Sequence, residues 1–515
     1  MRHLSPSRAL VAATGIALAG AMLAGCTSSS SAQGGADDPD SPHPGTITWA
    51  RPAASNGWEG DKCIDTSIPI NAAVYDTLLR IEVPEGDGLA PGLATEWEWN
   101  EAEKAYVLTI RDDAAFSNGE PVTPEDVAFS INEWIAGDFS GSYYANIERA
   151  EAVDETTVKI VMKQTDAFLP ALLTWCTSLI YPANYAGMSK EAFFQKPIGA
   201  GPYAVASWED PMGTSERITL VPNEHYYGWD GEPPLDEVVI RTIADTNQRA
   251  LEFQAGNIDL LDEIDSATAT QLPEDVIVET VPTQLHALLV NMTVPGLDNP
   301  GIRQALSLAL DRESLAITLE DTAVPAEGVL PINVPGWVAP TTPHTYDPER
   351  AARLIEESGV ANLTFTLLYD PSDHRSDIMA QTIKQQAAAV GITVKLENTD
   401  NNTLYARMGE SQFELTLTSP SAISPSIFDP IGWMAVQYGW TGSTSTTMDD
   451  EFLAGISTVD PEEQEKHVRA VQDFLTTDNG MIGLLNTGTK YASQPWVKGF
   501  EPLLYRTFYF DTLAD

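Results

Sequence analysis

The stretch Lys196–Glu209, "KPIGAGPYAVASWE", holds two closely spaced glycines, Gly199 and Gly201, ahead of an alternating apolar segment. Its G-x-G-x-x-A spacing matches that of a dinucleotide-binding turn, which follows a strand and opens a helix so that free backbone N–H groups meet the pyrophosphate. Here Pro202 removes one N–H group, and residues 203–209 alternate as a strand does. The stretch therefore predicts a structural turn that enters a strand, and it argues against a cofactor loop.

The composition is that of an ordinary folded protein and argues against several partners. The 515 residues are enough for more than one lobe, and 43% hydrophobic residues exclude bulk disorder. Acidic residues outnumber basic ones by 74 to 28, which gives a formal net charge of −46. Because such a surface repels phosphate groups, we expect no nucleic acid partner and no electrostatic docking on a membrane.

The sequence lacks the common signatures of catalysis. It has no H-E-x-x-H, no G-x-S-x-G, no Gly-Lys dipeptide for a phosphate loop and no paired C-x-x-C. Its seven histidines are scattered along the chain. We therefore expect a protein that is not an enzyme and that has no cofactor and no metal site.

The N-terminus predicts export and lipid attachment. Residues 1–25 combine a basic start with a short apolar run, as a signal peptide does. The sequence "LAGC", which ends at Cys26, resembles the lipobox of bacterial lipoproteins, in which the cysteine thiol takes a diacylglyceryl group; the alternative is a plain secretory cleavage site. Residues 26–44 are rich in Ser, Gly, Asp and Pro and predict a flexible tether. We expect a protein on the outer face of the cell membrane, held there only by the lipid on Cys26.

Two further cysteines, Cys63 and Cys176, suggest one disulfide bond. Outside the cytoplasm, such a pair is more often bonded than free. A metal site is the alternative, although neither cysteine lies in a C-x-x-C motif or near a histidine.

Capping residues and hydrophobic periodicity predict the elements of the folded part. Thr123 and Pro124 begin a helix, and another helix begins after Asp347 and ends at Gly359. A β-α-β order over residues 363–398 implies two parallel strands joined by a helix. Other predicted elements are strands at 46–52, 95–99, 105–111, 153–163, 203–209 and 413–419, and helices over 299–315 and 460–475.

A series of phrases in this order resembles the extracytoplasmic solute-binding proteins of the dipeptide and oligopeptide type (family 5), which deliver ligands to ABC importers. The resemblance covers residues 45 to 480, and the lipobox and tether fit the same family. The phrases are "LATEWEWNEAEKAYVLTIRDDAAFSNGEPVTPEDVAFSIN", "PIGAGPYAVASWE", "NEHYYGWDGEPPLDEVVIRTIAD", "LEFQAGNIDLL", "LLVNMTVPGLDNPGIRQALSLALDRESL", "YDPERAARLIEESGV" and "IKQQAAAVGITVKL".

This resemblance implies an α/β, two-lobed fold of the periplasmic-binding-protein type II class, with a hinge and an extra subdomain in lobe one. The ligand would lie in the cleft and be enclosed when the hinge closes. In this family the Gly-x-Gly phrase is a structural turn, so Tyr203 is expected to pack rather than bind. The implied domains are domain I at 45–75, 197–295 and 488–515, domain II at 76–196, and domain III, which is lobe two, at 296–487.

The family's topology also indicates which segments face the cleft. They are 56–63, 140–146 and 173–178 in lobe one, and 369–374 and 419–440 in lobe two. Aromatic and polar residues on these segments are the candidate ligand contacts. The candidates are Trp58, Tyr143, Trp175, Tyr369, Ser419, Asp429, Trp433, Tyr438 and Trp440.

One departure from the family's pattern leaves the ligand open. Peptide-binding relatives place an aspartate after a lobe-two strand, where it pairs with the ligand's ammonium group, but here the segment "TLTSPSAISPSIFDP" has no acid before Asp429. The partners expected from the resemblance are a peptide or another small solute and an ABC permease with its ATPase, and the receptor is expected to be a monomer. The alternatives are a receptor for a nickel chelate, sugar or opine, and a sensor subunit that signals to a membrane protein.

Overall fold

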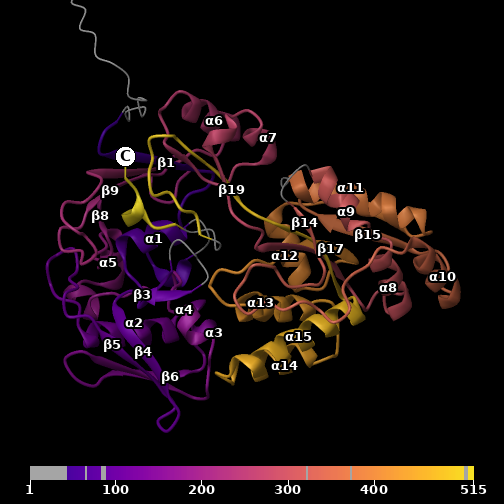
Figure 1. Cartoon of the computed structure of the whole chain (residues 1–515), viewed down its shortest axis with the longest axis horizontal. Coiled ribbons are helices and arrows are strands. Elements are labelled where there is room, and N and C mark those ends of the chain that lie inside the picture. Colours follow the sequence, from indigo (N-terminus) through magenta and orange to yellow (C-terminus); the bar gives the residue numbers. More distant parts are fainter. Residues whose placement is uncertain are drawn as a thin grey trace, which may run out of the picture. The chain divides into compact units, whose positions relative to one another are not determined.

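A computed structural model of the chain describes residues 43–63, 67–82, 88–319, 323–371, 374–503 and 508–514. The predicted signal peptide, Cys26 and nearly all of the tether lie outside these residues. The described part is a mixed α/β protein with two large sheets and two smaller ones (Figure 1).

The first large sheet has seven strands in the order β12-β19-β11-β1-β10-β9-β8. Strand β1 pairs in parallel with β10 and with β11, and the remaining pairs are antiparallel. Helices α1 (Ile68–Val74), α6 (Thr246–Gln254) and α7 (Ser266–Ala269) belong to this region. The strands are β1 (Thr46–Arg51), β8 (Tyr203–Glu209), β9 (Arg217–Pro222), β10 (Glu237–Thr242), β11 (Leu260–Leu261), β12 (Ile277–Glu279) and β19 (Lys490–Ser493).

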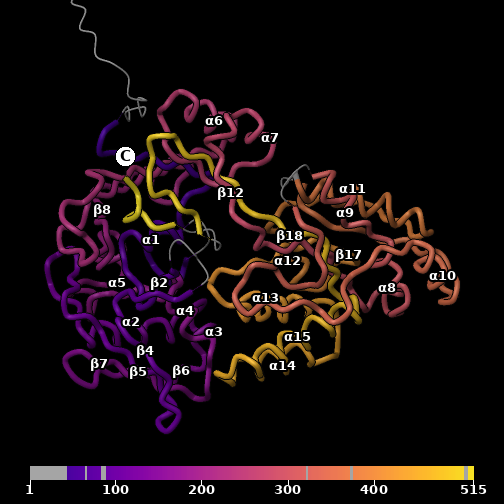
Figure 2. Tube along the Cα trace, in the orientation of Figure 1, coloured from indigo at the N-terminus to yellow at the C-terminus, as the bar shows by residue number. Residues whose placement is uncertain are grey.

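The C-terminal end of the chain completes the core of this sheet. The rings of Phe508 and Phe510 lie 5.2 and 5.7 Å from that of Trp49 on β1, in edge-to-face contacts. Figure 2 shows this yellow C-terminal segment beside the indigo elements from the start of the folded part. Residues about 460 positions apart therefore share one apolar cluster.

The two glycines of the opening stretch are required by close packing and not by an unusual backbone angle. A Cβ atom on Gly199 would lie 2.0 Å from the carbonyl oxygen of Val74, and one on Gly201 would lie 2.6 Å from that of Ala73. Neither glycine has a positive φ. The turn thus lets this segment lie against α1, and Tyr203 is fully buried as expected.

The second region contains a four-stranded antiparallel sheet in the order β4-β5-β7-β6 and a two-stranded sheet formed by β2 and β3. Helix α2 (Pro124–Ala136) begins as predicted, because the side chain of Thr123 and that of Asp126 each accept the other residue's backbone N–H. The other elements are β2 (Leu79–Ile81), β3 (Leu89–Pro91), β4 (Ala94–Asn100), β5 (Ala105–Ile110), β6 (Ile147–Ala152), β7 (Thr157–Met162), α3 (Ser140–Tyr143), α4 (Leu169–Leu172) and α5 (Lys190–Gln195).

The third region is built on a six-stranded sheet in the order β14-β18-β13-β17-β15-β16. Its strands are β13 (Gln284–Val290), β14 (Val324–Pro325), β15 (Thr364–Tyr369), β16 (Thr393–Asn398), β17 (Leu415–Thr418) and β18 (Met481–Thr487). Its helices are α8 (Pro300–Leu308), α9 (Arg312–Leu319), α10 (Pro348–Ser358), α11 (His374–Ala389), α12 (Asn401–Gly409), α13 (Phe428–Gly439), α14 (Thr447–Ile456) and α15 (Pro461–Asp478).

The predicted β-α-β unit is confirmed, since β15 and β16 pair in parallel and α11 joins them. The single helix predicted over 299–315 is wrong: it is broken between α8 and α9. The carboxylate of Asp311 accepts the N–H of Ser314 at 3.0 Å and so caps a new helix. The buried guanidinium of Arg312, the first residue of α9, donates to the carbonyl of Gly483 at 2.7 Å.

The chain passes between the two large sheets twice, and the two passages lie side by side. One connects β12 to β13 and the other connects β18 to β19. Thr280 N–H donates to the carbonyl of Thr489 at 3.0 Å, and Thr489 N–H donates to the hydroxyl of Thr280 at 2.9 Å. Strand β13 pairs within the six-stranded sheet, so the passage lies near residue 282, ahead of the expected boundary at 295/296.

Candidate ligand-binding site

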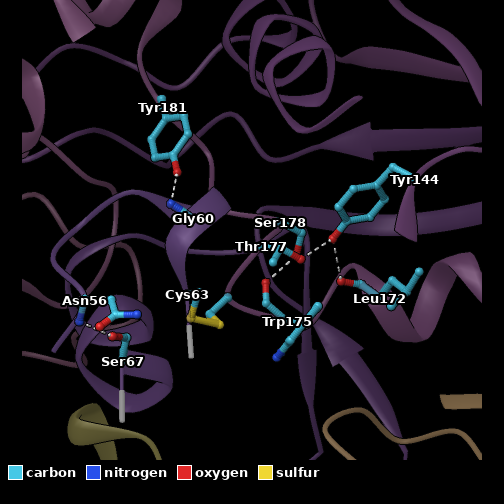
Figure 3. The surroundings of a disulfide bond; sticks show 11 residues. Asn56, Gly60, Cys63, Ser67, Tyr144, Leu172, Trp175, Thr177, Ser178 and Tyr181 are labelled. Carbon is cyan, nitrogen blue, oxygen red and sulfur yellow. Dashed lines mark hydrogen bonds between the residues drawn. A yellow bond between two sulfur atoms is a disulfide. The ribbon is translucent and has the colours of Figure 1, made fainter. Parts of the chain in front are cut away.

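A disulfide bond joins two of the segments that were expected to face the cleft. Cys63 and Cys176 are bonded, with their Cα atoms 6.1 Å apart, and both are buried. Figure 3 shows how local hydrogen bonds hold each side: Gly60 N–H donates to the Tyr181 hydroxyl at 2.9 Å, and the Ser178 hydroxyl donates to the carbonyl of Trp175 at 2.6 Å. The segments 56–63 and 173–178 are thus cross-linked beside Trp175.

Trp175 belongs to a cluster of three aromatic side chains. Its ring lies 4.9 Å from that of Tyr143 and 6.1 Å from that of Phe139, and the rings of Phe139 and Tyr143 are 5.4 Å apart. Trp175 is only 5% exposed, and its indole Nε1 has no hydrogen-bond partner. A buried N–H group without a partner is costly, so an acceptor placed against this group would stabilise the protein.

A small cavity lies between Trp175 and the loop that follows β17. Its lining includes Ile68, Asp76, Trp175 and Tyr509 on one side and Ile423 on the other. The cavity measures about 20 Å³, which is room for about one water molecule. Because Ile423 belongs to the six-stranded region and the others do not, the cavity is enclosed by both parts of the protein.

Asp76 is the charged side chain among the described residues of this lining. Only 4% of it is exposed, and this burial raises the pKa of its carboxyl group, although the nearby Arg80 acts in the opposite direction. The hydroxyl of Tyr227 donates to its Oδ2 at 2.6 Å, and the N–H of Thr77 donates to its Oδ1 at 2.9 Å.

Arg80 is itself paired with a different acid, Asp511. Two of its nitrogen atoms donate to the two Asp511 oxygens, each at 2.8 Å, and its guanidinium lies 4.0 Å from the centre of the Tyr509 ring. Burial would raise the pKa of Asp511, but Arg80 outweighs this effect and holds that pKa below its usual value. The C-terminal segment is thereby tied to the wall of the cavity.

The loop at 419–427 is held by its own hydrogen bonds. The carboxylate of Asp429 accepts the backbone N–H groups of Ile423 and Ser424, the latter at 3.0 Å. The Ser419 hydroxyl bonds to His286 Nδ1 at 3.0 Å, and His286 Nε2 bonds to the Thr487 hydroxyl at 2.9 Å. Asp429 therefore organises the loop that brings Ile423 to the cavity.

Of the nine candidate ligand residues, Trp175 is found among the described residues that line the cavity. Tyr143 contacts Trp175, and Trp433 and Trp440 contact each other with ring centres 5.7 Å apart. Residues 428–439, within the expected cleft segment 419–440, form helix α13. On it, Tyr438 is buried and donates to Asp478 at 2.8 Å.

Two other candidates are buried in the protein core. Trp58 packs edge-to-face against Trp208 at 5.7 Å, and the hydroxyl of Tyr369 donates to Asp377 at 2.7 Å. The sequence reasoning missed Phe139, Asp76 and Ile423. Phe139 could have been found from its four-residue spacing to Tyr143, whereas nothing in the sequence around Asp76 indicates that it lines a cavity.

Residues 88–445 match the model of the bacterial extracellular solute-binding proteins, family 5 Middle. The chain belongs to this family. The probable D,D-dipeptide-binding periplasmic protein DdpA of Escherichia coli K12 is 25% identical over 448 residues, which cover 84% of this chain and 85% of DdpA. The glutathione-binding protein GsiB of the same strain is 28% identical over 406 residues, which cover 74% of this chain and 77% of GsiB.

The fold agrees with this assignment. The crystal structure of NikA from Brucella suis, in complex with Fe(III)-EDTA, superimposes with a TM-score of 0.80 at 20% identity, and the match covers 91% of this chain and 99% of NikA. The expected α/β, two-lobed binding-protein fold is confirmed. Family members are extracytoplasmic proteins that bind small ligands or peptides and work with ABC transporters, and they are not enzymes.

Two features are absent from the residues that the structure describes. No helix there is long and apolar enough to cross a membrane. No group of three or more His, Cys, Asp or Glu side chains in that part of the chain is arranged to hold a metal ion.

Proposed function

We propose that this chain is a lipid-anchored extracytoplasmic receptor that binds a peptide or peptide-like solute between its two lobes and delivers it to an ABC importer. The observation that carries this proposal is the cavity between Trp175 and Ile423, because its lining comes from both large regions. Family membership supports the transport role. The curated relatives named above are a probable D,D-dipeptide-binding protein and a glutathione-binding protein, which favours a peptide-like ligand.

Binding in this receptor would require the lobes to separate. A cavity of about 20 Å³ is far below the roughly 300 Å³ or more that small-molecule sites occupy. The paired passages at Thr280 and Thr489 are the natural axis of such a movement, because two short segments there join the large sheets. The ligand would then supply contacts to both lobes that favour the closed state.

The first experiment identifies the ligand. The full-length protein is purified under native conditions, unfolded, and the released small molecules are analysed by mass spectrometry. A Trp175→Phe variant, which loses the unpartnered Nε1–H but keeps an aromatic ring, should retain less solute than the wild type. A Trp433→Phe variant tests the predicted contact between the ligand and Trp433 on α13. If no solute is released and none of a panel of di- and tripeptides raises the melting temperature, the proposed peptide ligand is wrong.

The lipid anchor needs its own test. We propose that Cys26 carries the lipid, that the protein is a monomer, and that the domains divide as the sequence predicts except that domain III begins near residue 282. Wild-type protein should partition into the detergent phase of a Triton X-114 extraction, and a Cys26→Ser variant should not. Equal partitioning of the two proteins would rule out lipidation at Cys26.

A further inference from the structure

We propose that Asp76 recognises a cationic amino group of the solute, with Trp175 Nε1 donating to an oxygen atom of the same molecule. The inference rests on the proposed function and names the ligand chemistry of that site. The ligand class is a compound with a primary ammonium group near a carbonyl oxygen, as at the amino terminus of a short peptide.

The first argument is the position of Asp76 and the bonds that it makes. Its side chain lines the same cavity as Trp175 and Ile423. Each carboxylate oxygen accepts one hydrogen bond, from Thr77 N–H and from the Tyr227 hydroxyl. Since a carboxylate oxygen can accept two, each of them keeps capacity for a donor on a ligand.

The second argument is the local balance of charge. The charged groups that face Asp76 are Arg80 and Asp511, and the other titratable groups in this network are Tyr226, Tyr227 and Tyr509. Arg80 makes its two short bonds to Asp511 and also donates to Tyr226. One guanidinium therefore serves two buried carboxyl groups, and Asp76 has no cation of its own among the described residues. A ligand ammonium would supply the missing charge, which is favourable in a buried site.

The third argument concerns the opposite wall of the cavity, to which the loop at 419–427 contributes Ile423. The loop at 419–427 contains no acidic residue, and the Asp429 carboxylate after it accepts two backbone N–H groups. The loop presents an apolar side chain, Ile423, to the cavity. A cationic group enclosed there would thus have to be neutralised from the side that carries Asp76.

The fourth argument is the donor on Trp175. Its Nε1–H is buried and has no partner. The indole ring contacts the rings of Tyr143 and Phe139, and the next residue, Cys176, is held by the disulfide bond. An N-terminal residue of a peptide carries an ammonium group and a carbonyl oxygen separated by one carbon atom. Asp76 and Trp175 together match these two groups in sign and in hydrogen-bonding role.

The test uses two probe libraries and full-length immobilised protein. One library contains di- and tripeptides with free amino termini, and the other contains the same peptides after N-acetylation. Mass spectrometry measures which members each protein retains. We expect the wild type to retain free-amine peptides and not their acetylated forms, and Asp76→Asn to bind them at least about tenfold more weakly because one charge of the buried pair is gone. Asp449→Asn, an exposed acid on α14, is the matched control and should bind as the wild type does.

The outcomes separate the two proposals. If the wild type retains acetylated and free peptides equally, or if Asp76→Asn retains them as well as the wild type does, the role of Asp76 is wrong while the receptor function stands. If the wild type retains neither library, the peptide-like ligand is wrong and the inference falls with it. If Asp76→Asn fails to fold, the retention of free-amine peptides is measured for Trp175→Phe in the same assay. Retention equal to that of the wild type would contradict the joint role of Asp76 and Trp175 Nε1.

Discussion

Cys63 and Cys176 are 113 positions apart in the sequence, and their disulfide bond lies directly beside Trp175, the aromatic residue that lines the cavity. The bond joins the segments 56–63 and 173–178, both of which were expected to face the cleft. The site is therefore built from loops that are covalently fixed to each other and not only packed together.

We predict that a Cys63→Ala/Cys176→Ala variant is less stable by about 2–4 kcal/mol, because the unfolded chain regains the freedom of a long closed loop. Urea unfolding followed by tryptophan fluorescence measures the loss. The matched control is wild-type protein unfolded in dithiothreitol, which should approach the stability of the variant. Identical midpoints for the oxidised wild type and the variant would show that the bond contributes nothing.

We predict that Glu216→Gln destabilises the protein by about 3 kcal/mol, since breaking a buried ion pair leaves a buried charge without its partner. Glu216 pairs with Arg51, and neither side chain is accessible to solvent. The carboxylate also accepts the backbone N–H of Ser55 at 2.9 Å and the indole N–H of Trp208 at 2.8 Å.

Glu216 also makes the free energy of unfolding depend on pH. Burial acts to raise the pKa of Glu216, but its hydrogen bonds and Arg51 hold that pKa below the usual value. A lowered folded-state pKa gives stability above the unfolded pKa of about 4.3, and this stability is lost as the pH falls through the folded value. Wild type and Glu216→Gln should therefore differ most at neutral pH and converge below about pH 4; a constant difference would contradict this origin.

We predict that Gly201→Ala lowers the free energy of unfolding by about 1–3 kcal/mol, because the new methyl group would press on the carbonyl oxygen of Ala73. Gly409→Ala is the matched control. Gly409 ends α12 with open space around it, so alanine there should be neutral or stabilising by about 0.5 kcal/mol. Thermal unfolding compares the two variants, and equal melting temperatures would contradict the packing argument.

The sequence was sufficient for the fold because local signals agree with the tertiary structure. Thr123 and Asp126 form the capping box at the start of α2, and Gly359 ends α10 in a left-handed conformation. These features depend on residues within a few positions of one another. The break between α8 and α9 depends on both kinds of contact, because Asp311 caps α9 locally while Arg312 reaches the distant carbonyl of Gly483.

The candidate site was harder to predict for the same reason. Trp175 could be predicted because it is an aromatic residue in a segment that the family's topology places at the cleft. Asp76 is one of 74 acidic residues, and only its contacts with Tyr227 and the cavity distinguish it. Tyr438 was misleading, because an aromatic residue near serines and prolines can equally be a buried partner of Asp478.

We predict that Asp429→Ala loosens the loop that carries Ile423. The substitution leaves the N–H groups of Ile423 and Ser424 without their acceptor, and losing the partner of a buried donor costs about 1–3 kcal/mol. The melting temperature should fall, and solute retention should fall with it because Ile423 lines the cavity. Asp449→Ala, at an exposed position, is the control. If Asp429→Ala retains solute as the wild type does, the hydrogen bonds that hold the loop do not matter for binding.

We predict that Asp76→Asn stabilises the ligand-free protein at neutral pH. Burial raises the pKa of Asp76, so the folded state binds the proton more tightly than the unfolded chain does. The stability that this proton gives is present below the unfolded pKa of about 3.9 and is lost as the pH rises through the folded-state value. Asparagine keeps one acceptor oxygen, which can serve the Tyr227 hydroxyl, and it loses the bond from Thr77 N–H but has no charge to bury. Melting temperatures measured in parallel from pH 4 to pH 8 should therefore be similar for the two proteins at the acidic end, with the variant higher at the neutral end. A variant that is less stable at neutral pH would mean that the Asp76 charge is already compensated within the protein, and it would remove the reason for expecting a cationic ligand.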